Sequence, residues 1–482
     1  MDLEAKNFDY SMKNIPLPTK NNYLKSLVEK VESLIIRMRW KVLFFNNADS
    51  ESTNNVNKTY GFKSKKTPPQ DELLKPFEED LINLIRNVEF QPVSDSFLKK
   101  LNDDVKEIKR INDVLVFADK TTNIYPVQKE TYRKLLHENI TKSYKKTRSP
   151  MCDKVNNDAA NIAADLHLEQ RMESYANKEA FITLKDHKDN FANHPKCRLI
   201  NPAKSEMGRV SKIILECINN KVRQATGLTQ WRNSSEVIKW FEKFSTNDNC
   251  TFIQFDVCEF YPSISESLLT NSIEYARSYC KISQNDVNII MHARQSLLFS
   301  EKVEWVRKKN DGTEDFFDVT MGSFDGAEVC EIVGLYILSQ IEKKFKNASI
   351  GLYRDDGLAI FHNLTRSRAE RVKKDLVEIF RKNGLSITVD ANLKIVNFLD
   401  ITLNLIKKTY YPYRKPNDTP LYIHKQSNHP NHIIEKLPEM INRRISEISC
   451  NESEFNKAKS VYEAALKKSG FTDEMRFKKY EK

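Results

Sequence analysis

The chain has no long hydrophobic run. Its longest apolar stretches, such as VLFF at 42–45, fall far short of the about 20 residues that a membrane-spanning helix needs. The first 14 residues, MDLEAKNFDYSMKN, lack the basic start and apolar stretch of a signal peptide. The sequence therefore predicts an intracellular protein, in the nucleus or the cytoplasm, that is neither secreted nor attached to a membrane.

Cysteine is present without clustering, and the chain has no internal repeat. The eight cysteines lie at positions 152, 197, 217, 250, 258, 280, 330 and 450. No two of them form a C-x-x-C pair, which argues against a zinc ribbon and against a disulfide framework. We expect reduced thiols.

Basic residues exceed acidic ones. The formal net charge is +11, from 77 Lys and Arg against 66 Asp and Glu. Part of this excess follows Asn404, where 16 basic against 10 acidic residues leave +6. An anionic partner such as nucleic acid fits this balance, and so does a solvated basic face. The length of 482 residues predicts about three domains or subdomains.

The first 111 residues have helical periodicity. Residues 22–45, 73–90 and 96–111 place apolar side chains every three or four positions, as amphipathic helices do. A polar linker that ends in prolines separates the first two, near 46–71. We predict a helical N-terminal extension over residues 1–111.

From about residue 112 the pattern changes to strands. DVLVFADKTTNIYPV predicts one strand pair, and FITLKDHK with KCRLINP predicts another. TFIQFDV reads as a buried strand, in which alternation places Asp256 on one face with Phe252 and Gln254 and the residues between them on the other.

Helices alternate with a hairpin in the next part of the chain. A helix is predicted after Pro262, with a capping box formed by Ser263 and Glu266, and further helices over 326–345 and 368–384. Between the last two, SIGLYRDDGLAIF predicts a hairpin. Strand, helix, helix, hairpin, helix, strand is the order of an α+β protein with a ferredoxin-like antiparallel sheet.

Two acidic residues at the tip of that hairpin have two interpretations. Asp-Asp-Gly is a common turn sequence, so Asp355 and Asp356 fit a purely structural role. Alternatively, the sheet brings Asp355 close to Asp256, although 99 residues separate them. Converging carboxylates are what a two-metal phosphoryl-transfer site requires.

Seven segments decide between these interpretations by their order. They are LVFADKTTNIY, FITLKDHKDNFANHPKCRLI, FDVCEFYPSI, MGSFDGAEVCE, LYRDDGLAIF, NLKIVNFLDITL and YPYRKPNDTPLYIHKQSNHP. In this order they resemble the motifs of reverse transcriptases, specifically the Penelope-like retroelement group, relatives of telomerase reverse transcriptase. The resemblance runs from about residue 112 to 449. It implies a right-hand polymerase with fingers at 112–235, palm at 236–409, and thumb with C-terminal tail at 410–482.

The resemblance implies a role for each matching residue at the metal and sugar positions. Asp256, Asp355 and Asp356 match the metal-binding carboxylates, with Asp356 the less direct ligand. This implies two Mg²⁺ ions, with Mn²⁺ as a possible substitute, and dNTP substrates. Tyr261 matches the steric gate, an aromatic ring under the sugar that excludes a 2′-hydroxyl; a core tyrosine is the alternative.

Other matches concern the triphosphate and the base pair. Lys185 and Arg198 match the fingers cations that grip the triphosphate, with Lys188 and Lys120 as competitors for the role of Lys185. Lys394 matches a palm lysine that protonates the leaving pyrophosphate. Gly322 matches a turn that lies against the nascent base pair, where a small residue lets the substrate approach.

The sequence departs from the family pattern at several positions. Arg354 stands inside Tyr-x-Asp-Asp and Gly357 follows this motif. Asp325-Gly326-Ala327 stands where many members have a Ser-Pro or Ala-Pro pair, and the fingers segment lacks its usual proline. These departures place the chain in a divergent branch. The three histidines of HKQSNHPNH, at 424, 429 and 432, fit no familiar zinc spacing, so we assign them to the junction with the thumb.

The resemblance implies an RNA-directed DNA polymerase that extends a primer 3′-hydroxyl on an RNA template. Its partners would be RNA template and DNA primer, or an RNA–DNA duplex. An RNA-dependent RNA polymerase is one alternative, which Tyr261 discriminates against; a non-catalytic nucleic-acid-binding protein derived from a retroelement is another. The 33 residues after Ser449 are too few for the GIY-YIG endonuclease of many Penelope-like elements, so we expect any endonuclease to be supplied separately.

Overall fold

The computed structural model describes most of the chain. The described residues are 4–5, 14–46, 67–91, 96–148, 151–165, 178–188, 191, 194–202, 206–244, 249–308, 314–346, 348–415 and 418–480. Most of the predicted linker at 46–71 lies outside these residues. None of the helices described is long and apolar enough to cross a membrane.

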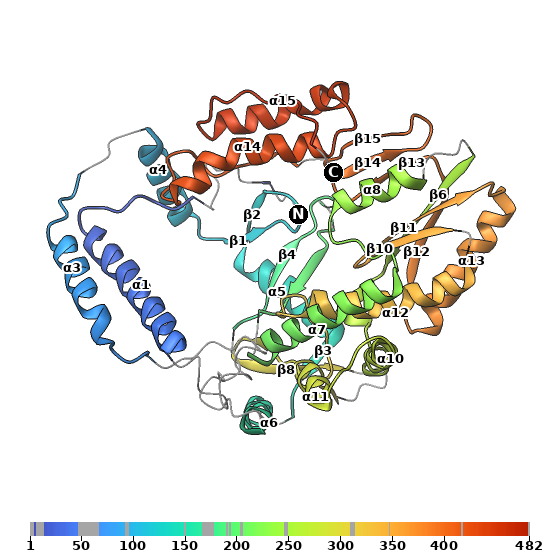
Figure 1. Ribbon diagram of the computed structural model, residues 1–482, viewed down its shortest axis with the longest axis horizontal. Helices are drawn as coiled ribbons and strands as arrows, with labels where there is room; N and C mark the ends of the chain where they lie inside the picture. Colours follow the sequence, from blue (N-terminus) through green and yellow to red (C-terminus); the bar gives the residue numbers. More distant parts are fainter. Residues whose placement is uncertain are drawn as a thin grey trace.

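A four-stranded antiparallel sheet, which we call the central sheet, organises the molecule (Figure 1). In spatial order its strands are β10 (Ser349–Tyr353), β11 (Asp356–His362), β6 (Cys250–Val257) and β12 (Ile387–Leu393). Counted in chain order from β6, the strands lie as 4-1-3-2 when read from β12. This is the ferredoxin-like order. The predicted α+β class with an antiparallel sheet is confirmed.

Helices cover one face of the central sheet and form the largest core. They are α7 (Glu206–Thr226), α10 (Glu266–Arg277), α11 (Gln284–His292), α12 (Gly326–Lys344) and α13 (Arg366–Lys382). Ile253, Phe255 and Val257 of β6 point into this core, and each such apolar side chain stabilises the fold by about 1.5–3 kcal/mol.

A second core covers the other face of the sheet. Phe252 of β6 belongs to it, so the predicted alternation along this strand is confirmed and Asp256 lies on this second face. The elements that build this core are α8 (Ser234–Phe244), β13 (Ile395–Phe398), β14 (Ile401–Asn404), β15 (Thr409–Pro412), α14 (Asn431–Glu447) and α15 (Glu452–Lys468).

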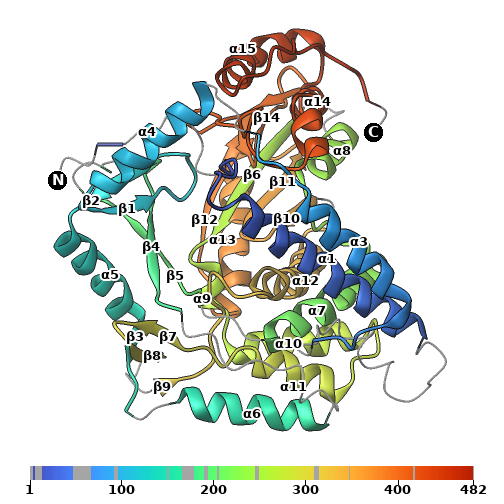
Figure 2. The same cartoon turned by 90° about the vertical axis from the view of Figure 1, so that its left-hand side faces the viewer.

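Smaller sheets lie to one side of the central sheet (Figure 2). Both predicted strand pairs are confirmed: β1 (Val114–Phe117) pairs with β2 (Ile124–Val127), and β4 (Phe181–Leu184) pairs with β5 (Cys197–Ile200). The remaining elements here are α5 (Lys129–Ser143), β3 (Tyr144–Lys146), α6 (Cys152–Asp165), β7 (Leu298–Ser300), β8 (Val303–Lys308) and β9 (Glu314–Asp315). The boundaries of fingers, palm and thumb stay a prediction.

The predicted capping box is wrong by two residues. Helix α10 begins at Glu266, and its N-cap is Ser265, whose hydroxyl accepts from the Leu268 N–H at 3.2 Å. Ser263 instead ends a separate short helix, α9 (Phe260–Ser263). Because this extra turn includes Pro262 and ends only at Ser263, α10 cannot begin as early as the sequence pattern suggests.

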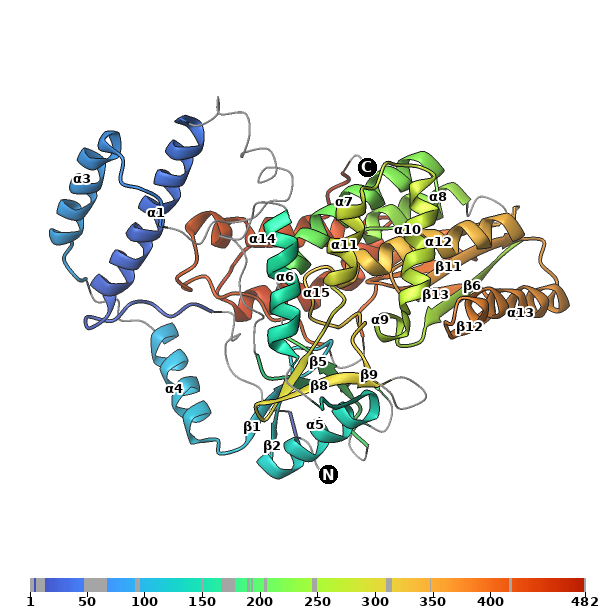
Figure 3. The ribbon, with the colours of Figure 1, turned by 90° about the horizontal axis from the view of Figure 1, so that it is seen from below.

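The helices predicted for the N-terminal extension are confirmed. They are α1 (Tyr23–Asn46), a 3₁₀ turn at Glu72–Leu74, α3 (Lys75–Arg86) and α4 (Ser96–Arg110). Helices α1 and α3 lie at the end of the molecule far from the central sheet (Figures 1 and 3). The Arg39 guanidinium binds both oxygens of Glu78, which joins these two helices.

His424 fixes the N-terminal extension to the C-terminal part of the chain. Its ring stacks on that of Phe97 in α4, with centroids 4.4 Å apart and an angle of 9° between the planes. Its backbone N–H donates to the Asn14 side chain at 2.8 Å. His424 is therefore a docking point between these two parts of the chain, and within the described residues no cluster of metal ligands includes it. The assignment of the three histidines to the thumb junction stays a prediction.

We expect Phe97→Ala to loosen this docking without unfolding the central sheet. Phe97 is fully buried, and loss of a buried phenylalanine ring costs about 3–5 kcal/mol. Hydrogen exchange should become faster in α4 and stay slow in β6. Phe77→Ala is the control, because Phe77 on α3 is 38% exposed. Unchanged exchange in α4 would contradict this docking role.

Candidate active site

One cavity of about 440 Å³ gathers six of the eight predicted site residues. It opens at the end of the central sheet where β6 ends and β11 begins. The six residues that line it are Lys185, Arg198, Asp256, Tyr261, Asp355 and Asp356. Gly322 is not among the lining residues, but it follows one of them, Met321, in the chain. Lys394 is elsewhere.

The three carboxylates meet because of the strand register. Asp256 lies directly opposite Asp356 across the antiparallel β6 and β11, where partner Cα atoms are about 4.5–5.5 Å apart. Asp355 occupies the two-residue turn between β10 and β11 together with Arg354, which has a left-handed φ of 52°. The Val257 N–H donates to the Asp355 carbonyl at 2.9 Å. This bond holds the turn against the end of β6.

Burial and mutual repulsion disfavour the ionised acids. Burial raises the pKa of Asp356 to about 6, and the charges of Asp355 and Asp256 add to this effect. Burial also raises the pKa of Asp256, with Asp355 as the next cause. A bound cation would offset both effects, because it stabilises the ionised carboxylates.

The three acids fit a Mg²⁺ ion that takes only some of its ligands from the protein. Within the described residues, no group of three side chains is already arranged as a metal cage. Mg²⁺ does not require one, since it commonly binds one or two carboxylates and completes its octahedron with water and substrate phosphates. Asp256, Asp355 and Asp356 supply the oxygen ligands that such an ion needs.

Two departures from the family pattern have structural explanations. Gly357 lies opposite Phe255 on β6, and any side chain at 357 would collide with the Phe255 ring. Asp325 is fully buried and accepts from the equally buried Arg294. Both residues serve the packing behind the site.

The two cations predicted to bind the triphosphate, Lys185 and Arg198, line the same cavity as the acids. The Arg198 guanidinium pairs with Asp119 at 2.8 Å. Burial lowers the pKa of Lys185, and Arg198 is the next cause. The turn at 119–123 that carries Lys120 is held by Asp186, which accepts from Thr121 at 2.5 Å and from Asn123 at 2.8 Å. The acid of the Lys-Asp-His-Lys segment is thus a structural residue.

Tyr261 forms part of the cavity wall next to the acids. It belongs to the short helix α9 and lies against Gly326, where an added Cβ would be 3.0 Å from the Tyr261 Cε1 atom. Burial raises the pKa of its hydroxyl, so the side chain is neutral. A neutral ring supported from behind is suited to exclude a substituent on a sugar.

The backbone conformation and the close packing at position 322 require glycine. Its φ is +115°, and a Cβ would collide with the Asn201 carbonyl. The Asn201 N–H donates to the Met321 carbonyl at 3.1 Å, which ties this turn to the end of β5. The predicted approach of a substrate to Gly322 stays a prediction.

We expect Gly322→Ala to lower the free energy of unfolding by at least about 2 kcal/mol, because strain and collision add. Gly384→Ala is the matched control, since Gly384 also has a positive φ, +72°, but nothing lies within 4 Å of an added Cβ. Urea denaturation of both variants measures the difference. Equal losses would show that the contact with Asn201 is unimportant.

Lys394 is not brought to the carboxylates. Its ammonium donates to the Cys250 carbonyl at 2.5 Å. Cys250 begins β6, and Asp256 follows six residues later, which is about 20 Å along a strand. The predicted protonation of pyrophosphate by Lys394 therefore has no geometric support.

Sequence reasoning missed Lys415. It lines the cavity together with Lys120 and Lys188, although it follows β15, far along the chain from the other site residues. The available signal was the Tyr-Arg-Lys-Pro segment, which we assigned only to the start of the thumb. A lysine there is not identifiable as a site residue until the tertiary structure places it.

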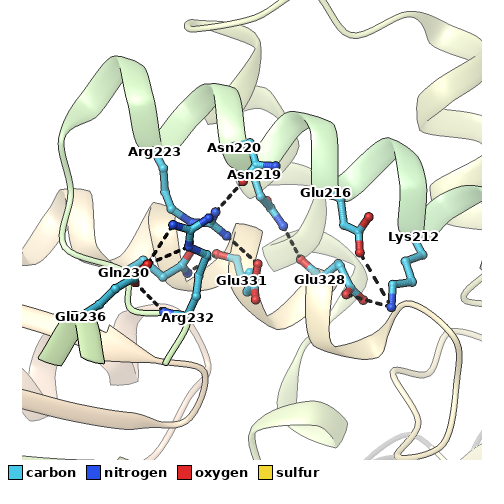
Figure 4. A network of polar contacts seen from close by, with 10 residues as sticks. All are labelled: Lys212, Glu216, Asn219, Asn220, Arg223, Gln230, Arg232, Glu236, Glu328 and Glu331. Atoms are coloured by element: carbon cyan, nitrogen blue, oxygen red, sulfur yellow. Dashed lines mark hydrogen bonds and ion pairs between the residues drawn. The ribbon is translucent and has the colours of Figure 1, made fainter. Parts of the chain in front are cut away.

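A polar network holds the helices behind the site (Figure 4). Arg223 of α7 pairs with Glu331 of α12 at 2.6 Å and donates to the Gln230 side chain at 3.0 Å. The segment next to Gln230 bonds to the hairpin strand β10, because the Leu352 N–H donates to the Thr229 carbonyl at 3.1 Å. Helix α12 and the hairpin that carries Asp355 are thereby fixed to one support.

Comparison with known proteins shows similarity only to solved structures. No protein-family model matches the chain. No curated protein has a significantly similar sequence.

Among solved structures, apo telomerase from Candida tropicalis matches with a TM-score of 0.47 and 12% identity, covering 94% of this chain and 89% of that one. Telomerase from Candida albicans, in complex with a TWJ fragment of telomeric RNA, matches with a TM-score of 0.47 and 11% identity, covering 95% of this chain and 87% of that one. The RNA-dependent RNA polymerase of a human picobirnavirus matches with a TM-score of 0.37 and 9% identity, covering 69% of this chain and 70% of that one. Because these TM-scores are below 0.5, we base the function on the residues of the site.

Proposed function

We propose that this chain is a nucleic-acid polymerase, and more specifically an RNA-directed DNA polymerase of the Penelope-like retroelement group. The observation that carries the proposal is the pairing of Asp256 with Asp356 across β6 and β11, with Asp355 in the adjoining turn. All three acids line a cavity that is also lined by several cations, among them Arg198, Lys185 and Lys415. The order of the sequence motifs supports the choice of group.

The carboxylates would hold two Mg²⁺ ions, which when bound would activate the primer hydroxyl and stabilise the charge on the transferred phosphoryl group. The residues of the chain then have separate tasks. Arg198 and the cavity lysines orient the triphosphate, for which a guanidinium fork is well suited. Tyr261 lies under the sugar and excludes a 2′-hydroxyl. These tasks need cations and carboxylates in one cavity, as they are found here.

The partners in this proposal are an RNA template and a DNA primer. The net charge of +11 favours binding of a duplex through its phosphates, and such binding weakens as salt rises. Shape and 2′-hydroxyl contacts would distinguish an RNA-containing duplex from DNA.

Primer extension by the purified chain tests the proposal. The substrates are an oligo-rA/oligo-dT duplex and dTTP, with Mg²⁺ or Mn²⁺, and UTP replaces dTTP in a parallel reaction. Extension with dTTP supports reverse transcription, and preferred extension with UTP would favour an RNA polymerase. Salt-sensitive duplex binding without extension under either metal would instead favour a non-catalytic nucleic-acid-binding protein.

A further inference from the structure

Four lysines of the active-site cavity form no ion pair with an acidic side chain among the described residues, although the charges of Lys120, Lys188 and Lys415 act on Asp256 and Asp356. The other cations of this cavity are paired: Arg198 with Asp119 at 2.8 Å, Lys142 with Glu259 at 3.0 Å, and Arg307 with Asp318 at 2.9 Å. The four that make no such ion pair within the described chain are Lys120, Lys185, Lys188 and Lys415. The cavity therefore holds more positive charge than its own acids neutralise once metal ions occupy the carboxylates.

Lys415 lines this cavity from a segment far along the chain from Lys120, Lys185 and Lys188. It follows β15, and the backbone on both sides of it is fixed. The Tyr413 N–H donates to the Asp400 carbonyl at 2.9 Å, and the Asp418 N–H donates to the Lys415 carbonyl at 3.2 Å. Because the backbone is held, the ammonium group has a limited range, and that range includes the cavity.

A direct contact joins the segment of Lys415 to the fingers turn of Lys120. The Thr122 hydroxyl donates to the Thr419 carbonyl at 3.2 Å. Thr122 lies two residues after Lys120, and Thr419 lies four residues after Lys415. The two lysines thus extend from segments that meet beside the three carboxylates.

Lys120 disfavours the charged form of Lys415 when no anion is bound. Burial lowers the pKa of Lys415 to about 8, and Lys120 is the next cause. Two ammonium groups held close together gain when an anion lies between them, because each charge is then compensated.

We propose that Lys415 completes the triphosphate site from the thumb side and binds, together with Lys120, the outer phosphates of the incoming nucleotide. This inference rests on the proposed polymerase function. The triphosphate is the fitting anion because Lys415 shares one cavity with the metal-binding acids and with Arg198. Lys415 is a binding residue here, and no proton transfer is assigned to it.

The test compares Lys415→Met, Lys415→Arg and Lys407→Met. Methionine keeps the apolar stem of lysine and removes its charge, and Lys407 is an exposed lysine on the same part of the chain, outside this cavity. Equilibrium binding of a non-hydrolysable dNTP to the enzyme–duplex complex is measured with Ca²⁺, together with the Kd of the duplex alone. Thermal melting checks that each variant is folded.

We expect Lys415→Met to raise the Kd of the nucleotide about 10-fold or more, as loss of a charge-assisted bond to phosphate does. Lys415→Arg should retain most of the affinity, and Lys407→Met should equal the wild type. The Kd of the duplex should not change. An unchanged nucleotide Kd would overturn the proposal, as would weakened duplex binding with unchanged nucleotide binding, which would assign Lys415 to a template or primer phosphate.

A second arm separates this inference from the proposed function. Binding of inorganic tripolyphosphate is measured without metal or duplex. If the wild type does not extend primers but binds tripolyphosphate in a Lys415-dependent way, the anion site is supported and the polymerase function is refuted. If the wild type extends primers and Lys415→Met binds tripolyphosphate and nucleotide normally, the polymerase function is supported and the proposed role of Lys415 is refuted.

Discussion

Asp355→Asn should reduce primer extension at least about 1,000-fold, which corresponds to roughly 4 kcal/mol of transition-state stabilisation. The substitution keeps the size of the side chain but removes the negative charge. The Val257 N–H holds the turn against β6 through the backbone carbonyl of residue 355. Because this bond does not involve the side chain, the hairpin should keep its shape. The lost term is the attraction between a carboxylate and the metal ions that stabilise the reacting phosphate. Single-turnover extension measures the rate.

Asp390→Asn is the matched control for this prediction. Asp390 lies on β12 of the same sheet, where it is exposed and pairs with Gln254, and it does not line the cavity. Its substitution should leave the extension rate unchanged. Comparable activity of the wild type and Asp355→Asn, with both proteins folded and duplex-bound, would refute the assignment of this site.

Tyr261→Ala should increase the use of ribonucleotides relative to deoxyribonucleotides by about 100-fold, or about 2.7 kcal/mol in relative transition-state binding. The ring forms part of the cavity wall and is supported from behind by Gly326, so it has no room to move away from a 2′-hydroxyl. Removal of the ring opens that space. The ratio of kcat/KM for UTP and dTTP on the same template measures the effect.

Two control variants make this result specific. Tyr261→Phe should keep the discrimination, because the ring and not its neutral hydroxyl excludes the sugar substituent. Tyr279→Ala should also keep it, since Tyr279 is 43% exposed and packs on Tyr275, away from the cavity. A wild-type enzyme that already uses UTP as readily as dTTP would contradict the gate and support the RNA polymerase alternative.

The candidate site residues whose local structure the sequence predicted correctly lie on regular elements or on the turn between them. Alternation along TFIQFDV assigned Asp256 to the face that it occupies, because the side-chain period of a strand is fixed by its geometry. The turn sequence Asp-Asp-Gly predicted a hairpin turn at Asp355 and Asp356; the hairpin is present, but its turn consists of Arg354 and Asp355, and Asp356 begins β11. The segments of Lys185 and Arg198 were predicted as paired strands, and β4 and β5 do pair.

Residues in connecting segments were harder to assign. Lys394 follows β12, and its position in the motif order pointed to the active site, but its ammonium is bonded to the Cys250 carbonyl at the other end of β6. Ser263 looked like an N-cap, yet an extra helical turn displaced the start of α10 to Ser265. In both cases the outcome depends on neighbours that are distant in sequence or on a turn that pattern alone does not specify.

The sequence by itself determined the α+β class, the strand that carries Asp256 and the hairpin that carries Asp355 and Asp356, because these follow from local periodicity and motif order. Only the tertiary structure decided which cations face those acids. Lys415 and Lys120 are 295 positions apart, and they meet because the contact between Thr122 and Thr419 joins their segments. The same holds for His424 and Phe97, whose stacking depends on the packing of two remote parts of the chain. Local sequence sets the conformation of a segment, whereas side-chain packing between segments decides which of them meet.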